Sequence, residues 1–397
     1  MSSALAPLDP RTTTSFVGTS VVALLAANLV PVLIGGMTAD LDMSVAEAGA
    51  VATGMSLGTA AALFVANMFV ARGDRPRTAR IGLLVMAAGF GSAALTSQTA
   101  VVTGGIVLGG VGCGIVSAAG TAAASATVDP DRTTSTVVIG NRLIAAMFLA
   151  VLPFLGHGLR TALIVLAVAA LAGTLIAGAL PNMPNRLPAA HRDQPFGPTA
   201  LTLAVVFGLW SLTEDMVYSM AENFATQHAH LSVGASSQLL SLKIVGGLAG
   251  ALATPFLLRR VGRSRSILAI LVIGTTCKFL IVTATSPAVY GTALVVWGVM
   301  YGAVLALVFG LAARMALSGR VGLLVQSIYI IGIACAPVVG GTLFSHASPL
   351  VFGLTVAVPS IVTGLILLAV SRRSGVSEYG GELAVPAGRT PEPLPRT

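Results

Sequence analysis

Five ionisable side chains lie inside long apolar stretches of this chain: Arg142, Glu214, Asp215, Lys243 and Lys278. The two lysines are the only ones in the sequence. A charged group in hydrocarbon costs at least about 2.5 kcal/mol on insertion scales, so such residues mark places where charge is paired, moved or bound. The chemistry open to this set is ion pairing, proton transfer and the binding of an ionic ligand.

The two adjacent acids and Lys243 are expected at one depth. Glu214 and Asp215 lie about fourteen residues into one apolar run, or ~21 Å along a helix, and Lys243 lies about six residues, or ~9 Å, into the antiparallel next run. An ion pair between Lys243 and one acid would only neutralise buried charge. The second acid is then in surplus, and because low dielectric favours a protonated carboxyl group, it is a candidate proton carrier. If the run ends earlier, both acids are in water instead.

We therefore predict proton coupling through Glu214, Asp215 and Lys243. Glu214 is the first choice, since Trp210 and Tyr218 lie four residues to either side of it on one helical stripe. If Lys243 neutralises one of the acids, removal of Lys243 alone should be more harmful than its removal together with that acid.

Arg142 lies about five residues into its run, or ~8 Å from the end that carries the basic loops. Its guanidinium could extend back to that surface, or it could contact a substrate or a gate. Trp297 and Tyr301 are one helical turn apart, which suits either packing or ligand contacts. The candidate substrate-binding residues are Asn28, Arg142, Trp210, Tyr218, Trp297, Tyr301, Gln326 and Tyr329.

About twelve apolar runs carry these residues, each near the ~20 residues that cross a bilayer as a helix. Hydrophobic residues make up 55% of the chain and charged residues 9%, with a mean hydropathy of +0.92. These values exclude an ordinary soluble protein, in which ~25% of residues are charged. The arginines cluster in alternate gaps between runs, and among the opposite gaps only one holds an arginine, Arg160. The positive-inside rule then predicts a multi-pass protein of the plasma (inner) membrane with both termini cytoplasmic.

A polar break rich in Pro, Asn and Arg divides the chain into two halves of six runs each. The two halves match in sequence at an offset of about 188 residues. This offset aligns Arg72 with Arg260, Arg75 with Arg263, and Gly58 with Gly246. The match predicts an all-α membrane protein with twelve transmembrane helices in two six-helix pseudo-symmetric bundles. The expected parts are an N-terminal bundle (1–180), a cytoplasmic linker (181–198), a C-terminal bundle (199–371) and a disordered, dispensable cytoplasmic tail (372–397).

This layout resembles the major facilitator superfamily over roughly residues 16–370. The basic loop VARGDRPR (70–77) keeps the Asp-Arg of that family's loop motif at Asp74 and Arg75, which the resemblance implies are gating residues. The first hairpin, with NLVP (28–31), ADLDMS (39–44) and AG (48–49), looks like the drug:proton antiporter branch. Departures from that branch are Leu108 where it has Arg, and LPFLGH (152–157) in place of its Gly-Pro-x-x-Gly-Gly; a better copy, APVVGG (336–341), lies in the eleventh run.

The resemblance implies a central cavity lined by spans that carry Arg142, Gln326, both acids and Lys243. The ninth span is peripheral in such folds, so Lys278 is expected to extend outward to the membrane surface. The leading hypothesis is a proton-coupled secondary transporter of a small organic molecule, with export (efflux) favoured. The alternatives are proton-coupled uptake of an organic anion, which Arg142 and Lys243 favour, and a non-transporting membrane sensor or assembly factor on the same fold.

The sequence argues against an enzyme, because it contains neither a nucleophile–base set nor metal-ligand spacing. No cofactor, catalytic residue or metal site is predicted. The expected partners are a small-molecule substrate, protons and the lipid bilayer. No nucleic acid is expected, because the net charge of +8 follows membrane sidedness. The protein is expected to act as a monomer.

Overall fold

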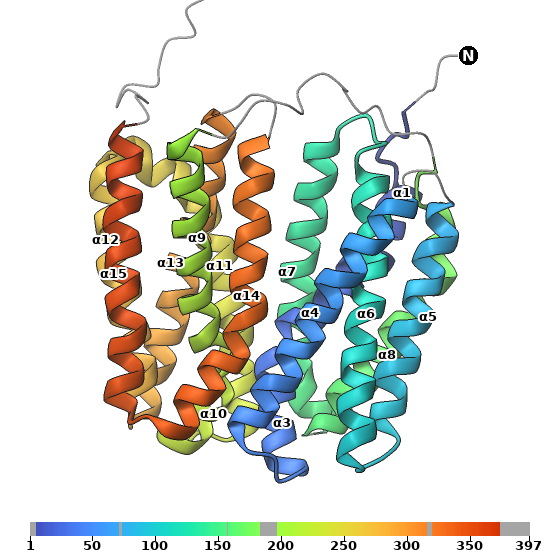
Figure 1. Cartoon of the computed structure of the whole chain (residues 1–397), viewed down its shortest axis with the longest axis horizontal. Helices are drawn as coiled ribbons and strands as arrows, with labels where there is room; N and C mark the ends of the chain where they lie inside the picture. The colour runs from blue at the N-terminus through green and yellow to red at the C-terminus, as the bar shows by residue number, and fades with distance from the viewer. Residues whose placement is uncertain (1–4, 71–73, 157, 183–196, 316–319, 374–397) are drawn as a thin grey trace, which may run out of the picture.

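The computed structural model describes residues 5–70, 74–156, 158–182, 197–315 and 320–373. The linker predicted at 181–198 and the tail predicted at 372–397 therefore lie mostly outside the described residues. In the described part, the helices form two groups that stand side by side (Figure 1).

The first bundle contains α1 (Pro10–Phe16), a π-helical segment (Val17–Val21), α2 (Val22–Asn28), α3 (Val30–Asp40), α4 (Val45–Val70), α5 (Arg75–Ala94), α6 (Thr99–Ala124), α7 (Pro130–Leu155), α8 (Leu159–Ile176) and a 3₁₀ turn (Ala177–Ala179). The second contains α9 (Pro198–Ser219), α10 (Ala221–Asn223), a π-helical segment (Phe224–His228), α11 (Val233–Val261), α12 (Arg263–Thr283), α13 (Pro287–Met315), α14 (Arg320–His346) and α15 (Pro349–Arg373).

These helices confirm the predicted fold. Ten of the described helices are long and apolar enough to cross a membrane, and the bent pair Pro10–Asn28 and Val30–Asp40 supplies an eleventh span. The remaining predicted span, α5, is not among them: its first turns carry arginines, and only its remaining residues are apolar. The start of α1 and the end of α15 lie at one end of the molecule, here called the linker side (Figure 1). The opposite end, where α3 leads into α4, is called the far side.

The first span is broken near its middle. α2 and α3 meet at Leu29, whose φ and ψ of −93° and 0° are not helical, and the two parts of the span differ in direction by 52°. Pro31 lies in the first turn of α3 and has no backbone N–H, so the hydrogen-bond ladder cannot continue through it. The break leaves backbone carbonyls available, and that of Asn28 accepts a hydrogen bond of 2.7 Å from the Tyr218 hydroxyl of the other bundle.

Glycines bring the bundles together near the far side. A Cβ on Gly49 of α4 would overlap the carbonyl of Pro337 in α14, and a Cβ on Gly341 would lie 2.5 Å from the carbonyl of Val45. Two residues of the APVVGG segment are therefore placed where α14 packs against α4. Small residues at such contacts let helix backbones approach closely in a membrane.

The two ends of the molecule are packed differently. One continuous apolar core joins the first bundle to the far half of the second, from Met216 to Ala229 and on to Val356. The linker half of the second bundle has apolar clusters of its own, which contain Leu203, Phe207 and Val308 in one and Ile267 in another. The bundles thus share a core on the far side, while the linker half of the second bundle is packed separately.

Within the second bundle, α11 and α13 form a seam of glycines. A Cβ on Gly298 would overlap the backbone of Lys243, and a Cβ on Gly302 would overlap that of Gly247. Gly250 meets the backbone of Val299 in the same way. The helices that carry Lys243 and the aromatic residues of α13 are therefore held in direct backbone contact.

Candidate functional site

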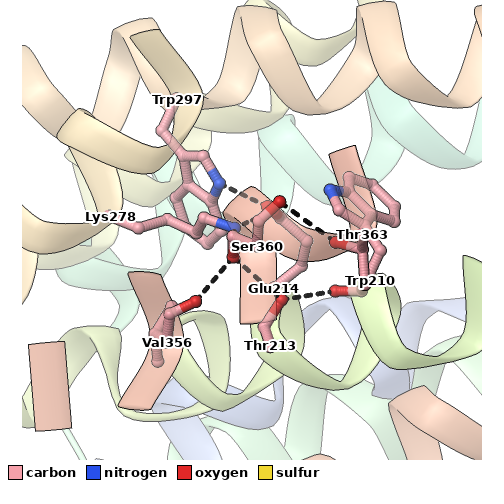
Figure 2. A network of polar contacts seen from close by, with 8 residues as sticks. All are labelled: Trp210, Thr213, Glu214, Lys278, Trp297, Val356, Ser360 and Thr363. Atoms are coloured by element: carbon pink, nitrogen blue, oxygen red, sulfur yellow. Dashed lines mark hydrogen bonds and ion pairs between the residues drawn. The ribbon is translucent and has the colours of Figure 1, made fainter. Parts of the chain in front are cut away.

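Glu214 lies in a polar network inside the second bundle (Figure 2). Its Oε1 forms an ion pair of 2.5 Å with the Lys278 ammonium, and its Oε2 accepts a hydrogen bond from the indole N–H of Trp297. Lys278 also donates to the Ser360 hydroxyl at 2.6 Å. The Lys278 and Glu214 side chains are only 2% and 4% exposed. Four helices, α9, α12, α13 and α15, supply this network.

The network shows that the expectation for Lys278 was wrong. We expected its side chain to extend outward from a peripheral span, but it points into the bundle and is buried. The physical reason is that a carboxylate and a hydroxyl lie within reach inside, where the ammonium is neutralised and hydrogen bonded. The sequence did contain a signal: the two adjacent acids, Glu214 and Asp215, are matched by two intramembrane lysines, so pairing of an acid with Lys278 was possible.

The ion pair is further supported by hydroxyl groups. Thr213, next to Glu214 in α9, lies 3.3 Å from the Ser360 hydroxyl, and Ser360 donates to the carbonyl of Val356 at 2.7 Å. A buried ion pair with these additional hydrogen bonds is neutral overall and fixed in place. Glu214 is therefore a weaker proton-coupling candidate than its place in the sequence suggested.

Lys243 lies among aromatic rings instead of beside a carboxylate. Its Nζ is 3.8 Å from the ring centre of Tyr218, 4.4 Å from that of Trp297 and 4.8 Å from that of Tyr301. Among the described residues, it forms no ion pair within 4.0 Å. Ring faces carry partial negative charge, so these contacts stabilise the ammonium without neutralising it. Pairing of Lys243 with Glu214 is not observed.

Asp215 is the acid without a direct partner. Its Oδ2 is buried and has no hydrogen-bond partner among the described residues. The charges that act on it most strongly are those of Lys243, Glu214 and Arg142, in that order. The adjacent acids of α9 thus face different surroundings: Glu214 points into the second bundle, and Asp215 belongs with the cations between the bundles.

Arg142 of α7 reaches this region from the first bundle. Its Nη1 lies 3.4 Å from Oδ1 of Asn28, and its guanidinium carbon is 5.8 Å from the ring centre of Tyr301. Asn28 also donates to the side chain of Asn141 at 3.2 Å. These contacts place Arg142 in the region between the bundles that also holds Lys243 and Asp215, here called the central site. The side chain does not extend back to the membrane surface. The broken first span positions Asn28 for this role.

Aromatic side chains form one wall beside the cations. Phe207 stacks on Trp210 at 5.1 Å and on Tyr329 at 4.9 Å between ring centres. Trp210 stacks on Tyr301 at 5.5 Å, and the Tyr301 and Tyr329 hydroxyls are 2.5 Å apart. The structure therefore brings together seven of the eight predicted substrate-binding residues around Lys243 and Arg142. The eighth, Gln326, is exposed on α14, one turn from Tyr329.

A small, largely apolar cavity adjoins the ion pair. It measures about 40 Å³ and lies between α9, α12, α13 and α15, from Glu214 and Lys278 toward Leu203 and Leu367 near the linker side. Trp297 and Tyr301 line it as well and so separate it from the central cations. Its lining residues all belong to the second bundle, and Phe207, Trp210, Trp297 and Tyr301 are common to this cavity and the site between the bundles.

The predicted gating residues lie at the linker-side end of the first bundle. Asp74 caps α5 by accepting a hydrogen bond of 3.2 Å from the backbone N–H of Arg77. Arg75 is buried, its N–H donates to the Asn182 side chain and its guanidinium to the carbonyl of Pro181. The loop therefore ties α5 to the point where the chain leaves the first bundle. A gating role for Asp74 and Arg75 stays a prediction.

Three residues of these networks were missed at the level of sequence: Asn141, Phe207 and Ser360. Serine and phenylalanine are common in membrane helices, so nothing in the sequence set Ser360 and Phe207 apart from other residues of their type. Asn141 adjoins Arg142, and a second polar side chain at that depth was an available signal. Lys278 was noticed and misplaced.

Comparison with known proteins agrees with the fold. The chain matches the Major Facilitator Superfamily over residues 15–329. Solved structures with the same fold include the nucleoside transporter NupG (15% identity, TM-score 0.69, 92% of this chain and 100% of that chain). A mutant of the peptide transporter POT in complex with sulfate (12%, 0.74, 94% and 98%) and the human organic anion transporter MFSD10, or TETRAN (16%, 0.66, 91% and 100%), share it too.

No curated protein matches the chain in sequence. At these identities the structural likeness concerns the fold. The family match spans most of the chain and includes both bundles. The chain is a multi-pass membrane protein that belongs to the Major Facilitator Superfamily.

Proposed function

We propose that the protein is a proton-coupled secondary transporter of a small organic anion, with Asp215 as the exchangeable proton site. The observation that carries this proposal is the charge balance of the central site. Glu214 is neutralised by Lys278, so Arg142 and Lys243 face a single unpaired carboxylate, that of Asp215. The site has one cation in excess and favours an anionic ligand.

The two cations belong to different bundles. Arg142 lies on α7 and Lys243 on α11, and both are within 6 Å of the ring of Tyr301. An acid group bound between them would bridge the bundles and relieve the repulsion between the two cations. The aromatic wall of Phe207, Trp210 and Tyr329 offers apolar surface for the rest of the ligand. Such a bridge is suited to two bundles that rock about a central site.

Asp215 links the anion to a proton. With the site empty, the carboxylate is stabilised by the charges of Lys243 and Arg142. When a substrate anion takes over these cations, the carboxylate loses that stabilisation and binds a proton. Anion and proton then move together with no net charge, and an inward proton gradient drives uptake.

A second candidate is the export of an organic cation in exchange for a proton at Asp215. It is favoured by the likeness of residues 28–49 to the first hairpin of drug:proton antiporters. The two functions differ in the sign of the response to a proton gradient. A proton gradient directed into the vesicle concentrates an anion inside in the first case and removes a cation from it in the second.

The test is flux in proteoliposomes with an imposed pH gradient and a panel of organic anions and cations. We expect accumulation of an anion that Asp215→Asn abolishes, while exchange of labelled for unlabelled anion continues. Exchange persists because it needs no net proton movement. Accumulation by Asp215→Asn protein would contradict the role of Asp215, and cation efflux would establish the second candidate. Absence of flux for every compound would favour a sensor.

A further inference from the structure

A second unpaired acid, Glu222, lies on the far side of the molecule. It belongs to α10, beyond the end of the membrane span Pro198–Ser219. Its side chain is 3% exposed, and its Oε2 has no hydrogen-bond partner among the described residues. It is therefore a buried carboxyl group that the proposed transport cycle does not use.

The carboxyl group is held between the bundles. Its Oε1 lies against Gly35 of α3, where a Cβ would overlap it. Next to it, Asn223 donates to the hydroxyl of Thr38 in the same helix at 3.3 Å. Gly35 thus leaves the space that the Glu222 carboxyl group occupies. The carboxyl group is enclosed in that space only while α3 and α10 are in contact. A cavity of about 10 Å³ adjoins the carboxyl group and is lined by Val32, Ser237 and other residues of both bundles.

The groups around Glu222 offer it no counter-charge. From α3 it faces Asp40, a second acid, whose Oδ2 accepts a hydrogen bond of 2.7 Å from the N–H of Leu159. On α13, the Tyr290 hydroxyl donates to the carbonyl of Ala221. The His228 ring that follows α10 contacts the carbonyl of Val282.

The remaining neighbours carry no charge. α11 contributes Val233 and Ser237, and the α7–α8 junction contributes glycines. Among the described residues, no cation lies within 4.0 Å of Glu222. Burial, with the charge of Asp40 second, raises the pKa of Glu222 from 4.5 to about 8.

We infer that Glu222 is a second proton-binding site, which joins the two bundles on the far side when protonated and releases them when ionised. The far side is the face that the arginine distribution predicts to be extracellular. The inference goes beyond the proposed function, since it concerns the closure of one face and requires neither an anionic substrate nor Asp215.

The sign of the effect follows from the two states. In an open far side the carboxyl group is in water with an ordinary pKa near 4.5, and in the closed state that pKa is about 8. The closed state therefore binds more protons between these values. Its stabilisation by Glu222 is complete below the lower value and is lost as the pH rises through the higher one. Within this window, closure weakens by up to about tenfold per pH unit.

The experiment measures access to Ser237, which is 2% exposed and lines the adjoining cavity. In intact cells and in a background where Cys113, Cys277 and Cys335 are replaced by Ala, Ser237→Cys is labelled with a membrane-impermeant maleimide. Ser286→Cys, exposed on the same side, is the reference that corrects for the pH dependence of thiol reactivity. Equal surface expression is confirmed for each variant.

We expect the labelling rate of position 237, divided by that of position 286, to rise at least tenfold between pH 6 and pH 9, because the two pH units below the closed-state pKa of about 8 each contribute up to tenfold. Glu222→Gln should keep the ratio low and constant, because the amide imitates the protonated acid. Gly35→Ala should keep it high at every pH, because the added methyl group removes the space for the carboxyl group. Asp40→Asn should shift the rise to lower pH.

A pH-independent ratio in the otherwise native chain, or an unchanged rise in Glu222→Gln, would overturn the inference. So would a fall in the ratio on addition of Na⁺ at constant pH, which would identify a metal cation as the ligand. If Glu222→Gln fails to reach the surface, Asp40→Asn alone decides, since an unshifted profile contradicts the inference. The readout needs no transport, so its failure and that of the proposed function are distinguishable.

Discussion

Glu214 and Asp215 are neighbours in α9, but their surroundings differ in charge balance. The carboxylate of Glu214 is neutralised by a direct partner and, among the described residues, that of Asp215 is not. Glu214 belongs to a closed network: Lys278 neutralises its carboxylate, the Trp297 N–H donates to it, and Ser360 accepts a hydrogen bond from Lys278. Asp215 faces Lys243 and Arg142 across a distance that no direct contact spans. A satisfied charge stabilises a structure, whereas an unsatisfied one can respond to a ligand or a proton. Under the proposed function, this difference separates a structural acid, Glu214, from a proton-carrying one, Asp215.

The largest expected effect is on the closed network. Lys278→Ala leaves the Glu214 carboxylate buried without its partner and should destabilise the protein by about 3–5 kcal/mol. Lys278→Ala with Glu214→Gln should recover much of that loss, since no charge remains. The measurement is thermal unfolding of purified protein in detergent. A double variant no more stable than Lys278→Ala would show that the pair is not the source of stability.

Asp215→Asn is expected to affect transport and not stability, the reverse of Lys278→Ala. It should lower stability little, because Asp215 makes no direct ion pair, yet abolish pH-driven accumulation of substrate. Stability and flux are measured on the same preparation, with Glu214→Gln as the matched control in the adjacent position. If Asp215→Asn unfolds as readily as Lys278→Ala, the division between a structural and a functional acid fails.

Arg142→Gln tests the first-bundle half of the anion site. Loss of one charged hydrogen-bond donor to an acid group costs about 1.5–3 kcal/mol, so the KM for an anionic substrate should rise at least tenfold. The melting temperature should change little, since Arg142 makes a long contact of 3.4 Å to Asn28 and lies 5.8 Å from the ring centre of Tyr301. An unchanged KM would remove Arg142 from the binding site.

The smallest effect is expected for Trp297→Phe. Phenylalanine keeps an aromatic face for Lys243 but has no N–H to donate to Glu214, so a loss of about 1–3 kcal/mol in stability is expected. The KM should stay within a few fold of the original value. A KM that rises as strongly as in Arg142→Gln would place Trp297 in contact with the substrate.

The sequence predicted more of the fold than of the site. Twelve spans follow from apolar length and arginine placement, which are local properties of the chain. Partner choice among buried charges depends instead on helix rotation and on contacts between distant segments. Lys278 shows this clearly: its depth could be read from the sequence, but its inward direction is set by α9 and α15. The surroundings of Glu222 could not be predicted, because the break at Met220 and the fit to Gly35 are tertiary features.

The glycine seam between α11 and α13 has a consequence for how the protein can be observed. Because those helices meet backbone to backbone, we expect Lys243 and Trp297 to move together when the bundles rock, with the ammonium still over the indole. The chain has two tryptophans, Trp210 and Trp297, and both are in the second bundle at the site. If the proposed function is correct, we expect their fluorescence to change when an anion binds beside Lys243 and to change little when the bundles rock.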